Sequence, residues 1–433
     1  MVFIMAMAFS TLGWPEKTPE LEYFYPTDLL VTAYDILFFW VARMIMGGME
    51  MMDEIPFKSV YLHGLVLDEN AVKMSKSLGN SPDPIDIMEK FGTDALRFSM
   101  VFNTPKGNDV IYTDSLIETG RNFANKIWNA ARFALTNAAE IDGLPEETEE
   151  PTDLTDKCIL HGLNEVKKTV KAAYDEYRFL DVTHQLYEFF WNEYCAWYLE
   201  IIKDRFYNSE DLSSRKMAKY LMLIVLNESL KMLHPIMPFI TEEIWQRTKE
   251  FYPSEKAESI MISDFPVATD KDSYPEESEQ MQLIFKMITA IRSIRKDMNV
   301  SPSEYVEIIM RDVLPARCAV LQDNRHYIKV MAKVEDIYIG DDAVKPEKST
   351  TTVVDDIEIY MPLEGIIDVD KERERLLKKL SKVEKSLIKC VGKLNNENFV
   401  SNAPTDIIEQ EKERKEQLEN TIEKLKANIS FLE

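Results

Sequence analysis

KMSKSLGN, residues 73–80, is the stretch on which the interpretation of this sequence rests. Lys73 and Lys76 lie three residues apart among small residues, so both ammonium groups can reach one polyanion. A lysine on its flexible stem can follow negative charge that moves during a reaction. Gly79 lets the backbone turn, and Met74 can fill a gap beneath the loop. The stretch predicts a phosphate-binding loop, whereas a solvated basic turn is the simpler interpretation of two lysines alone.

The segments around this loop read as alternating strands and helices. The run Leu29–Thr32 is typical of a buried parallel strand, and the residues from Asp35 onward predict an apolar helix packed on a sheet. Residues 57–66 predict a second strand that leads into the loop, and Asp83-Pro84 opens a following helix. Because α/β folds bind ligands at the carboxyl ends of their strands, the turn at 32–35 is a candidate site.

The composition describes a strongly acidic protein with enough apolar residues for ordinary cores. The 433 residues carry a net charge of −24, and 45% are hydrophobic, a length that allows about three domains. Such a charge argues against unfocused attraction to nucleic acid, so any RNA contact must come from local basic patches. The cysteines indicate neither a zinc ribbon nor a disulfide framework, which predicts no protein-bound metal and a reduced, cytoplasmic setting. These widely spaced cysteines are Cys158, Cys195, Cys318 and Cys390.

The N-terminal run MVFIMAMAF, residues 1–9, is apolar but lacks a basic segment before it. It is too short to span a bilayer, and we expect no membrane partner. We interpret it as a buried strand, with a signal peptide as the alternative. An apolar strand at the edge of an incomplete sheet would also be prone to association.

Residues 121–265 read as a helical bundle. Apolar residues recur every three or four positions over 159–177, aromatic residues gather over 186–202, and a third apolar helix ends at His234-Pro235. The aromatic residues are interpreted as core, and none is assigned to base stacking.

A polar, acidic linker at 265–280 leads to a small α/β subdomain. The helix after the linker carries a basic cluster that either contacts RNA or forms a solvated helix face, and it consists of Arg292, Arg295 and Lys296. Runs with a period of two predict strands, and they cover Tyr305–Ile309, Ile337–Ile339 and Val353–Met361.

Residues 366–433 predict two helices packed as an antiparallel coiled coil. Apolar residues spaced four and three apart run from Leu376 to Leu394 and from Leu418 to Leu432, with turn formers and Pro404 between them. A row of lysines outside the seam either contacts a phosphate backbone or forms an ordinary charged helix face. The row consists of Lys378, Lys382, Lys385 and Lys389, with Lys379 and Lys393 beside them.

These motifs together resemble the class I aminoacyl-tRNA synthetases and, within them, the valine-specific branch. KMSKS resembles the loop that stabilises the pyrophosphate of ATP in that family, with Lys76 at the place of its second lysine. Residues 25–44, YPTDLLVTAYDILFFWVARM, are similar to the segment near the ribose and the amino-acid pocket, with Ala33 where the branch carries glycine. WNEYCAWYLE and LHPIMPFITEEIW resemble the anticodon-binding domain, and a hairpin with NFVSNAP at its bend resembles the tRNA-binding arm.

The resemblance implies an α/β catalytic half-domain, part of a Rossmann-like class I synthetase fold, followed by an α-helical bundle, a small α/β subdomain and a C-terminal antiparallel coiled coil. The implied domains are the second half of the catalytic domain with loop and stem (1–120), the helical anticodon-binding domain (121–265), the linker and small α/β subdomain (266–365) and the coiled-coil tRNA-binding arm (366–433).

The resemblance also implies an activity, the ligation of valine to its tRNA through valyl-adenylate, with ATP as a substrate and Mg²⁺ beside it. Lys73 and Lys76 would be catalytic, and Trp40 would wall the valine pocket. The implied ATP-binding residues are Lys76, Ser75, Ser77, Ala33 and Asp35, and those of the tRNA arm are Lys378, Lys382, Lys385 and Lys389.

The family's other signature, a His-x-Gly-His loop, does not occur in this sequence, and none of its five histidines lies in that pattern. His63 is interpreted as a polar strand-end residue rather than a general base. We therefore expect a C-terminal half that works with a separate N-terminal half, and editing residues are assigned to no position. The competing hypotheses are a non-catalytic tRNA-binding module and a coiled-coil interaction protein with no RNA role.

Overall fold

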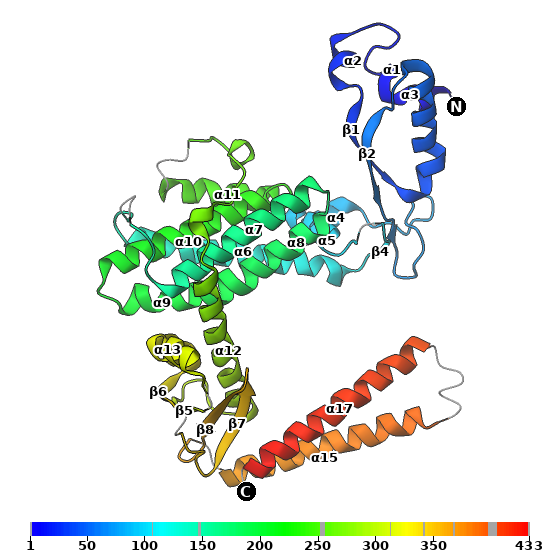
Figure 1. Ribbon diagram of the computed structural model, residues 1–433. Helices are drawn as coiled ribbons and strands as arrows, with labels where there is room; N and C mark the ends of the chain where they lie inside the picture. Colours follow the sequence, from blue (N-terminus) through cyan, green and yellow to red (C-terminus); the bar gives the residue numbers. More distant parts are fainter. Residues whose placement is uncertain are drawn as a thin grey trace. The chain divides into compact units, whose positions relative to one another are not determined.

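The structure is a computed structural model that describes residues 2–105, 107–145, 149–251, 256–311, 313–340, 343–366, 369–396 and 405–431 (Figure 1). Helices dominate it, and the sheets are small. The chain divides into two compact units, Met1–Pro275 and Glu276–Glu433.

The first unit begins with two short parallel sheets and the helices beside them (Figure 1). β1 pairs with β2, and β3 pairs with β4, so the parallel strands expected at Leu29–Thr32 and within 57–66 are confirmed. The expected burial of Leu29–Thr32 is wrong, because Val31 is 58% exposed and Thr32 is the buried residue of the four. The elements are α1 (Val2–Ser10), α2 (Pro19–Phe24), β1 (Thr27–Ala33), the 3₁₀ turn η1 (Tyr34–Ile36), the π-helical turn η2 (Leu37–Val41), α3 (Ala42–Met52), β2 (Phe57–His63), β3 (Val66–Leu67) and β4 (Val110–Ile111).

The N-terminal run forms helix α1, so the expected strand is wrong. Met and Ala favour helices, and a short apolar run does not show by itself which of the two structures it adopts. α1 packs against α3 at Gly47, where an added Cβ would lie 2.4 Å from the carbonyl oxygen of Met5. Phe9 is fully buried in a cluster with Leu21 and Tyr25, so the chain that follows α1 anchors its end.

The segment after Asp35 is helical, but it is not buried all round as expected. Its first turns are η1 and η2, and within them Phe38 and Phe39 are 79% and 62% exposed. Val41 and Met44 are buried in a cluster with Phe57 of β2. One face of the segment therefore packs on the sheet, and the apolar composition could not show that the other face is exposed.

A helical stem leads away from the loop. α4 (Pro84–Phe91) begins after Asp83, whose Oδ1 accepts a hydrogen bond from the N–H of Ile85 at 2.8 Å. This is the helix start that Asp-Pro predicts, because the side chain satisfies a free N–H group of the first turn. Gly92, with φ +96°, separates α4 from α5 (Thr93–Phe102).

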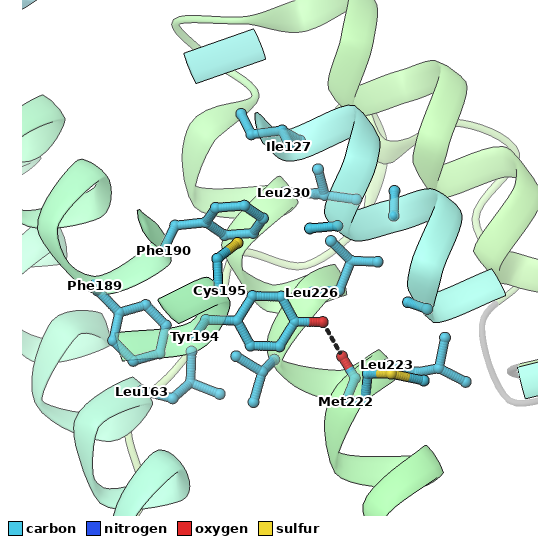
Figure 2. Close-up of a cluster of buried hydrophobic side chains, with 14 of the residues drawn as sticks. Ile127, Leu163, Phe189, Phe190, Tyr194, Cys195, Met222, Leu223, Leu226 and Leu230 are labelled. Atoms are coloured by element: carbon cyan, nitrogen blue, oxygen red, sulfur yellow. Dashed lines mark hydrogen bonds between the residues drawn. The ribbon is translucent and has the colours of Figure 1, made fainter. Parts of the chain in front are cut away.

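The rest of the first unit is the expected helical bundle. Its core contains Phe189, Phe190, Tyr194 and Cys195 (Figure 2), and the Oη of Tyr194 donates to the carbonyl oxygen of Met222 at 2.8 Å. The interpretation of these aromatic residues as core is thus confirmed. The helices are α6 (Asp114–Glu140), α7 (Leu154–Asp175), α8 (Phe179–Glu188), the π-helix η3 (Phe189–Tyr198), α9 (Leu199–Asn208), α10 (Leu212–Leu233), α11 (Pro238–Thr248) and the 3₁₀ turns η4 (Lys249–Phe251), η5 (Ile260–Ile262) and η6 (Asp270–Asp272).

Charged side chains of α5 join the stem to the bundle. The buried carboxylate of Asp94 accepts a hydrogen bond from the N–H of Ile240, near the start of α11, at 2.6 Å. Arg97 donates to the carbonyl oxygen of Ile236 at 2.9 Å, in the turn between α10 and α11. The stem is therefore held by the proline-containing turn that ends α10.

The second unit contains a four-stranded sheet with strand order β6-β5-β8-β7. β5 runs parallel to β6 and antiparallel to β8, and β7 and β8 form a hairpin. The single strand expected at Val353–Met361 is wrong, because Asp355 and Asp356, with φ of 48° and 70°, form a tight turn inside it. The elements are α12 (Pro275–Asp297), β5 (Val306–Arg311), α13 (Pro315–Asp323), α14 (Arg325–Ala332), β6 (Val334–Ile339), β7 (Ser349–Val354) and β8 (Ile357–Pro362).

Two long helices, α15 (Val369–Leu394) and α17 (Thr405–Phe431), end the described chain and lie side by side (Figure 1). Lys393 pairs with Glu411 at 2.7 Å, and Lys426 lies 3.8 Å from Glu384. These pairings run in opposite directions along the two helices, which makes them antiparallel. Most of the expected bend, residues 397–404, lies outside the described residues.

Candidate functional site

Parallel pairing brings the ends of β1 and β2 to one edge, where the chain turns into the candidate site. Ala33 and His63 lie opposite each other there. The Oη of Tyr34, directly after β1, donates to Asp109 Oδ2 at 3.0 Å, and Asp109 Oδ1 accepts the N–H of Leu65 at 2.7 Å. One carboxylate therefore holds both the turn after β1 and the segment between β2 and β3.

Gly64 lies where the chain passes from β2 to β3. An added Cβ at Gly64 would lie 1.6 Å from the carbonyl oxygen of Asn108, so only glycine allows this close approach. His63 Nδ1 lies 2.8 Å from the carbonyl oxygen of Gly64, and the His63 side chain is otherwise exposed at the strand end.

Asp68 organises the turn that leads into the loop. Its Oδ1 accepts hydrogen bonds from the N–H groups of Asn70 at 3.0 Å and Val72 at 2.9 Å. Its Oδ2 accepts from the side-chain amide of Asn80 at 2.8 Å. These hydrogen bonds, that from Asn80 first, lower the pKa of the Asp68 carboxyl, so Asp68 is a carboxylate at neutral pH.

Asn80 spans the base of the loop. Its Oδ1 accepts the N–H of Ser75 at 2.9 Å, while its Nδ2 lies 3.4 Å from the carbonyl oxygen of Lys73 and also donates to Asp68. The two ends of segment 75–80 are thus joined by one side chain. Sequence interpretation assigned no role to Asp68 or Asn80, although Asp and Asn beside a turn commonly bind nearby backbone groups.

Two of the sequence-predicted residues meet directly. Lys73 Nζ forms an ion pair with Asp35 Oδ2 at 2.5 Å, which links the loop to η1 across 38 positions of the chain. Both side chains are partly exposed, so water screens the pair. A residue expected to bind phosphate and one expected to bind ribose therefore neutralise each other in this structure.

The other lysine of the loop points to solvent. Lys76 is exposed and forms no ion pair within the part of the chain that the structure describes. The Oγ atoms of Ser75 and Ser77 lie 3.3 Å apart, and Ser75 Oγ accepts the N–H of Leu78 at 3.3 Å. Lys76 is thus the lysine of the described loop whose charge no carboxylate neutralises.

Ala33 and Trp40 lie on either side of Asp35 in the chain. Ala33 ends β1 with extended backbone (φ −74°), a conformation that accepts a Cβ without strain. Trp40 lies in η2 and is partly exposed next to the exposed Phe39. Trp40 is therefore accessible to a ligand.

A cavity of about 290 Å³ lies behind the loop. Met74 lines it and is half-buried, which agrees with the expected place of Met74 beneath the loop. The other lining residues are Leu65, Val66, Lys73, Ser81, Pro82, Pro84, Ile87, Leu96, Met100 and Tyr112.

The acidic residues Asp35 and Asp68 have partners within the protein. Asp35 is paired with Lys73, and Asp68 accepts three hydrogen bonds. The residues that the structure describes contain no cluster of three or more His, Cys, Asp or Glu suited to a metal ion.

Two members of the basic cluster of α12 bind backbone carbonyl groups, while Lys296 is exposed. Arg295 is buried, and its guanidinium donates to the carbonyl oxygens of Lys333, Ser301 and Glu304 at 2.7–3.0 Å. Arg292 donates twice to the carbonyl oxygen of Met331. Arg295 is therefore a buried part of the fold, which the sequence pattern did not reveal, and the two expected interpretations still apply to the exposed Arg292 and Lys296.

The lysine row of α15 is exposed along the helix. Lys378 pairs with Glu374 at 2.7 Å, a contact within one turn. Positions 378, 382, 385 and 389 repeat at intervals of four, three and four, so they share one face of the helix.

Among the described residues, no helix combines the length and apolar character needed to cross a bilayer.

Three protein families match consecutive parts of this chain. Residues 5–113 match "tRNA synthetases class I (I, L, M and V)", and residues 156–310 match "Anticodon-binding domain of tRNA ligase". Residues 368–433 match "Valyl tRNA synthetase tRNA binding arm". The matches follow one another in the order expected from the motifs.

Two curated relatives agree with the family matches. A valine–tRNA ligase of Geobacter sulfurreducens is 41% identical over 410 residues, which cover 94% of this chain and 45% of that protein. The valine–tRNA ligase of Fusobacterium nucleatum is 40% identical over 428 residues, 98% of this chain and 48% of that protein. A solved structure of Mycobacterium tuberculosis methionyl-tRNA synthetase with methionyl-adenylate has a TM-score of 0.48 at 22% identity, over 60% of this chain and 55% of that chain. The chain spans about half the length of the curated relatives that it matches, and it belongs to the valine–tRNA ligase family of class I tRNA synthetases.

Proposed function

We propose that this chain supplies the phosphate-binding loop and the tRNA-binding parts of a valine–tRNA ligase. The observation that carries the proposal is the loop at 73–80, in which Lys76 is exposed and Lys73 pairs with Asp35 just after β1. Identity of about 40% to valine–tRNA ligases over nearly the whole chain supports it. In the reaction, the valine carboxylate attacks the α-phosphorus of ATP, and pyrophosphate leaves. A hydroxyl of the terminal adenosine of the tRNA then attacks the carbonyl carbon of valyl-adenylate, and AMP leaves.

Lys76 has the central role in this proposal. As pyrophosphate leaves, negative charge grows on its oxygens, and an ammonium group placed against them stabilises the transition state more than the ground state. Ser75 and Ser77 would donate hydroxyl hydrogen bonds to the same phosphates, and the backbone at Ala33 would lie against the nucleotide. Trp40 would form an apolar wall for the side chain of valine.

ATP binding would break the ion pair between Lys73 and Asp35 and give each side chain a new partner. When ATP enters, Lys73 would turn to a phosphate and Asp35 would accept a hydrogen bond from a ribose hydroxyl. Each group then keeps a partner of suitable charge or polarity, which limits the desolvation cost of the exchange. Mg²⁺, held by the phosphates, would neutralise part of their charge.

The remaining parts would hold tRNA and complete the fold. Residues 1–120 would form the second half of the catalytic domain, 121–265 the anticodon-binding domain, and 266–365 the linker and small α/β subdomain. Residues 366–433 would form a coiled-coil arm whose lysine row contacts the tRNA backbone. The setting of the enzyme would be cytoplasmic.

Replacing Lys76 by Ala tests the catalytic proposal. The chain is combined with a separately expressed N-terminal half of the Geobacter sulfurreducens relative, and valine-dependent exchange between ATP and pyrophosphate is measured. Loss of a transition-state donor lowers kcat by about a hundredfold to a thousandfold. Lys17→Ala, an exposed lysine outside the loop, is the matched control and retains full exchange. Equal kcat for Lys76→Ala and the unchanged chain would refute the assignment.

Replacing Lys378, Lys382, Lys385 and Lys389 by Ala tests the arm. Each lost phosphate contact lowers the slope of log affinity against log salt by about 0.7 to 0.9 units. Binding of valine tRNA is measured over a range of KCl concentrations, with an unrelated tRNA as the comparison. If the affinity and the slope both stay unchanged, the lysine row has no contact with tRNA. An arm effect without any exchange activity in the combined halves would favour the non-catalytic tRNA-binding module.

A further inference from the structure

The loop that carries Lys76 has little apolar packing to define its shape. Leu78 is 65% exposed, and Lys76, Ser77 and Gly79 are also exposed. Of the loop residues, Lys73 and Met74 line the cavity behind the loop. The backbone bond from Met74 to Val66 at 3.2 Å holds only the start of the loop. Hydrogen bonds of side chains must therefore hold the segment on which Lys76 lies.

One side chain holds both ends of that segment. Asn80 stands at its end, and the Oδ1 of Asn80 accepts the N–H of Ser75 at its beginning. The Nδ2 of Asn80 is turned toward Asp68, which is itself fixed by two backbone N–H groups of the turn after β3. Lys76 is thus connected to the sheet through a chain of hydrogen bonds from Ser75 to Asn80 to Asp68.

We propose that Asn80, oriented by Asp68, is a positioning residue for Lys76 in the activation of valine. The inference rests on the proposed function, since it assigns to Lys76 the charge that Asn80 puts in place. An amide at position 80 is required because it accepts from Ser75 on one side and donates to Asp68 on the other. A carboxylate at 80 would face the carboxylate of Asp68, and a methyl group would release both ends of the segment.

The geometry allows a swap that separates this role from general damage. Asn80→Asp alone opposes two carboxylates, and Asp68→Asn alone opposes two amide donors. In the double variant, the new amide at 68 can accept from the backbone with its oxygen and donate to the new carboxylate at 80, which still accepts from Ser75. The single variants therefore lose the chain of hydrogen bonds, and the double variant restores it.

The first measurement uses this chain alone and does not depend on activity. Amide hydrogen exchange is followed in peptides that cover residues 73–80, where the N–H of Ser75 reports the bond to Asn80. Protection of Ser75 falls in Asn80→Asp and in Asp68→Asn and returns in the double variant. Asn70→Ala is the matched control, because Asn70 binds Asp68 only through its backbone N–H and its exposed side chain is dispensable. Unchanged protection in both single variants overturns the proposal.

The second measurement uses the two combined halves. We expect kcat of valine-dependent exchange to fall roughly tenfold to a hundredfold in each single variant, as for a misplacement of about 1 Å, and to recover in the double variant. Adding Asn80→Ala to Lys76→Ala should cause no further loss, because both act on one interaction. The positioning role would be overturned if the losses of kcat from Asn80→Ala and Lys76→Ala multiplied in the combined variant. It would also be overturned if the single variants lost protection of Ser75 but kept full kcat. Unchanged exchange in Lys76→Ala would instead refute the proposed function.

Discussion

The helical bundle and the surface of η2 treat the same side chain in opposite ways. Phe189 and Phe190 are 1% and 0% exposed in the core of the bundle, whereas Phe38 and Phe39 are 79% and 62% exposed in η2. Burial of a phenylalanine contributes about 1.5–3 kcal/mol to stability relative to leaving it exposed. Phe189 and Phe190 therefore stabilise the bundle, whereas Phe38 and Phe39 contribute little to the stability of this chain. The bundle completes its own core, while η2 presents apolar surface of the kind that binds a partner. Under the proposed function, that partner is the other half of the catalytic domain.

Replacing one phenylalanine in each region gives the largest expected difference. Phe190→Ala removes a fully buried ring and lowers the free energy of unfolding by about 3–5 kcal/mol, since a cavity adds to the lost transfer energy. Phe39→Ala removes the same atoms from an exposed place and changes the free energy by less than about 0.5 kcal/mol. Urea unfolding of the purified chain, followed by near-ultraviolet circular dichroism, measures both. Equal losses in the two variants would show that η2 is covered in solution.

The acidic residue Glu193 of η3 extends the comparison to charge. Burial, with repulsion from Glu188 second, raises the pKa of the Glu193 carboxyl to about 7. Because the folded state binds this proton more tightly than the unfolded state, the contribution of Glu193 to stability is fully present below about pH 4.5 and is lost as the pH rises through about 7. The slope can reach about 1.4 kcal/mol per pH unit.

Glu193→Gln mimics the protonated form and should flatten this dependence between pH 5 and pH 8. Urea unfolding at several pH values is the measurement, and Glu188→Gln on the exposed side is the comparison. Glu188→Gln removes only the repulsion, so it should reduce the pH dependence without abolishing it. The same pH slope in Glu193→Gln as in the unchanged chain would mean that another group titrates.

The elements that the sequence predicted well are those in which local pattern and packing agree. The strand β1, the start of α4 after Asp83 and the bundle helices all follow from period, caps and proline positions. The predictions failed where contacts with residues distant in the sequence determine the structure. α1 is helical and packs against α3 at Gly47. The guanidinium of Arg295 donates hydrogen bonds to carbonyl oxygens of a loop and of the residue that follows α14.

The site shows the same division between local and distant causes. The motif string identified the loop and its lysines, because their spacing is a property of consecutive residues. It could not identify the ion pair between Lys73 and Asp35, since 38 positions separate them in the chain. Asp68 and Asn80 could be found from sequence only by asking which side chains satisfy the backbone of an exposed loop.

The smallest expected effect concerns the exposed ion pair between Lys73 and Asp35. Its removal shows whether this ion pair or the side chain of Asn80 holds the loop in place. Asp35→Asn removes the charge opposite Lys73 but leaves Asp68, Asn80 and their bonds to the backbone intact. Exposed ion pairs contribute about 0.2–1 kcal/mol, so the free energy of unfolding should change by no more than that. Hydrogen exchange of residues 73–80 should also stay as slow as in the unchanged chain, because the bond from Ser75 to Asn80 does not involve Lys73. Faster exchange of the Ser75 amide in Asp35→Asn would show that the ion pair, and not Asn80, keeps the segment of Lys76 in place.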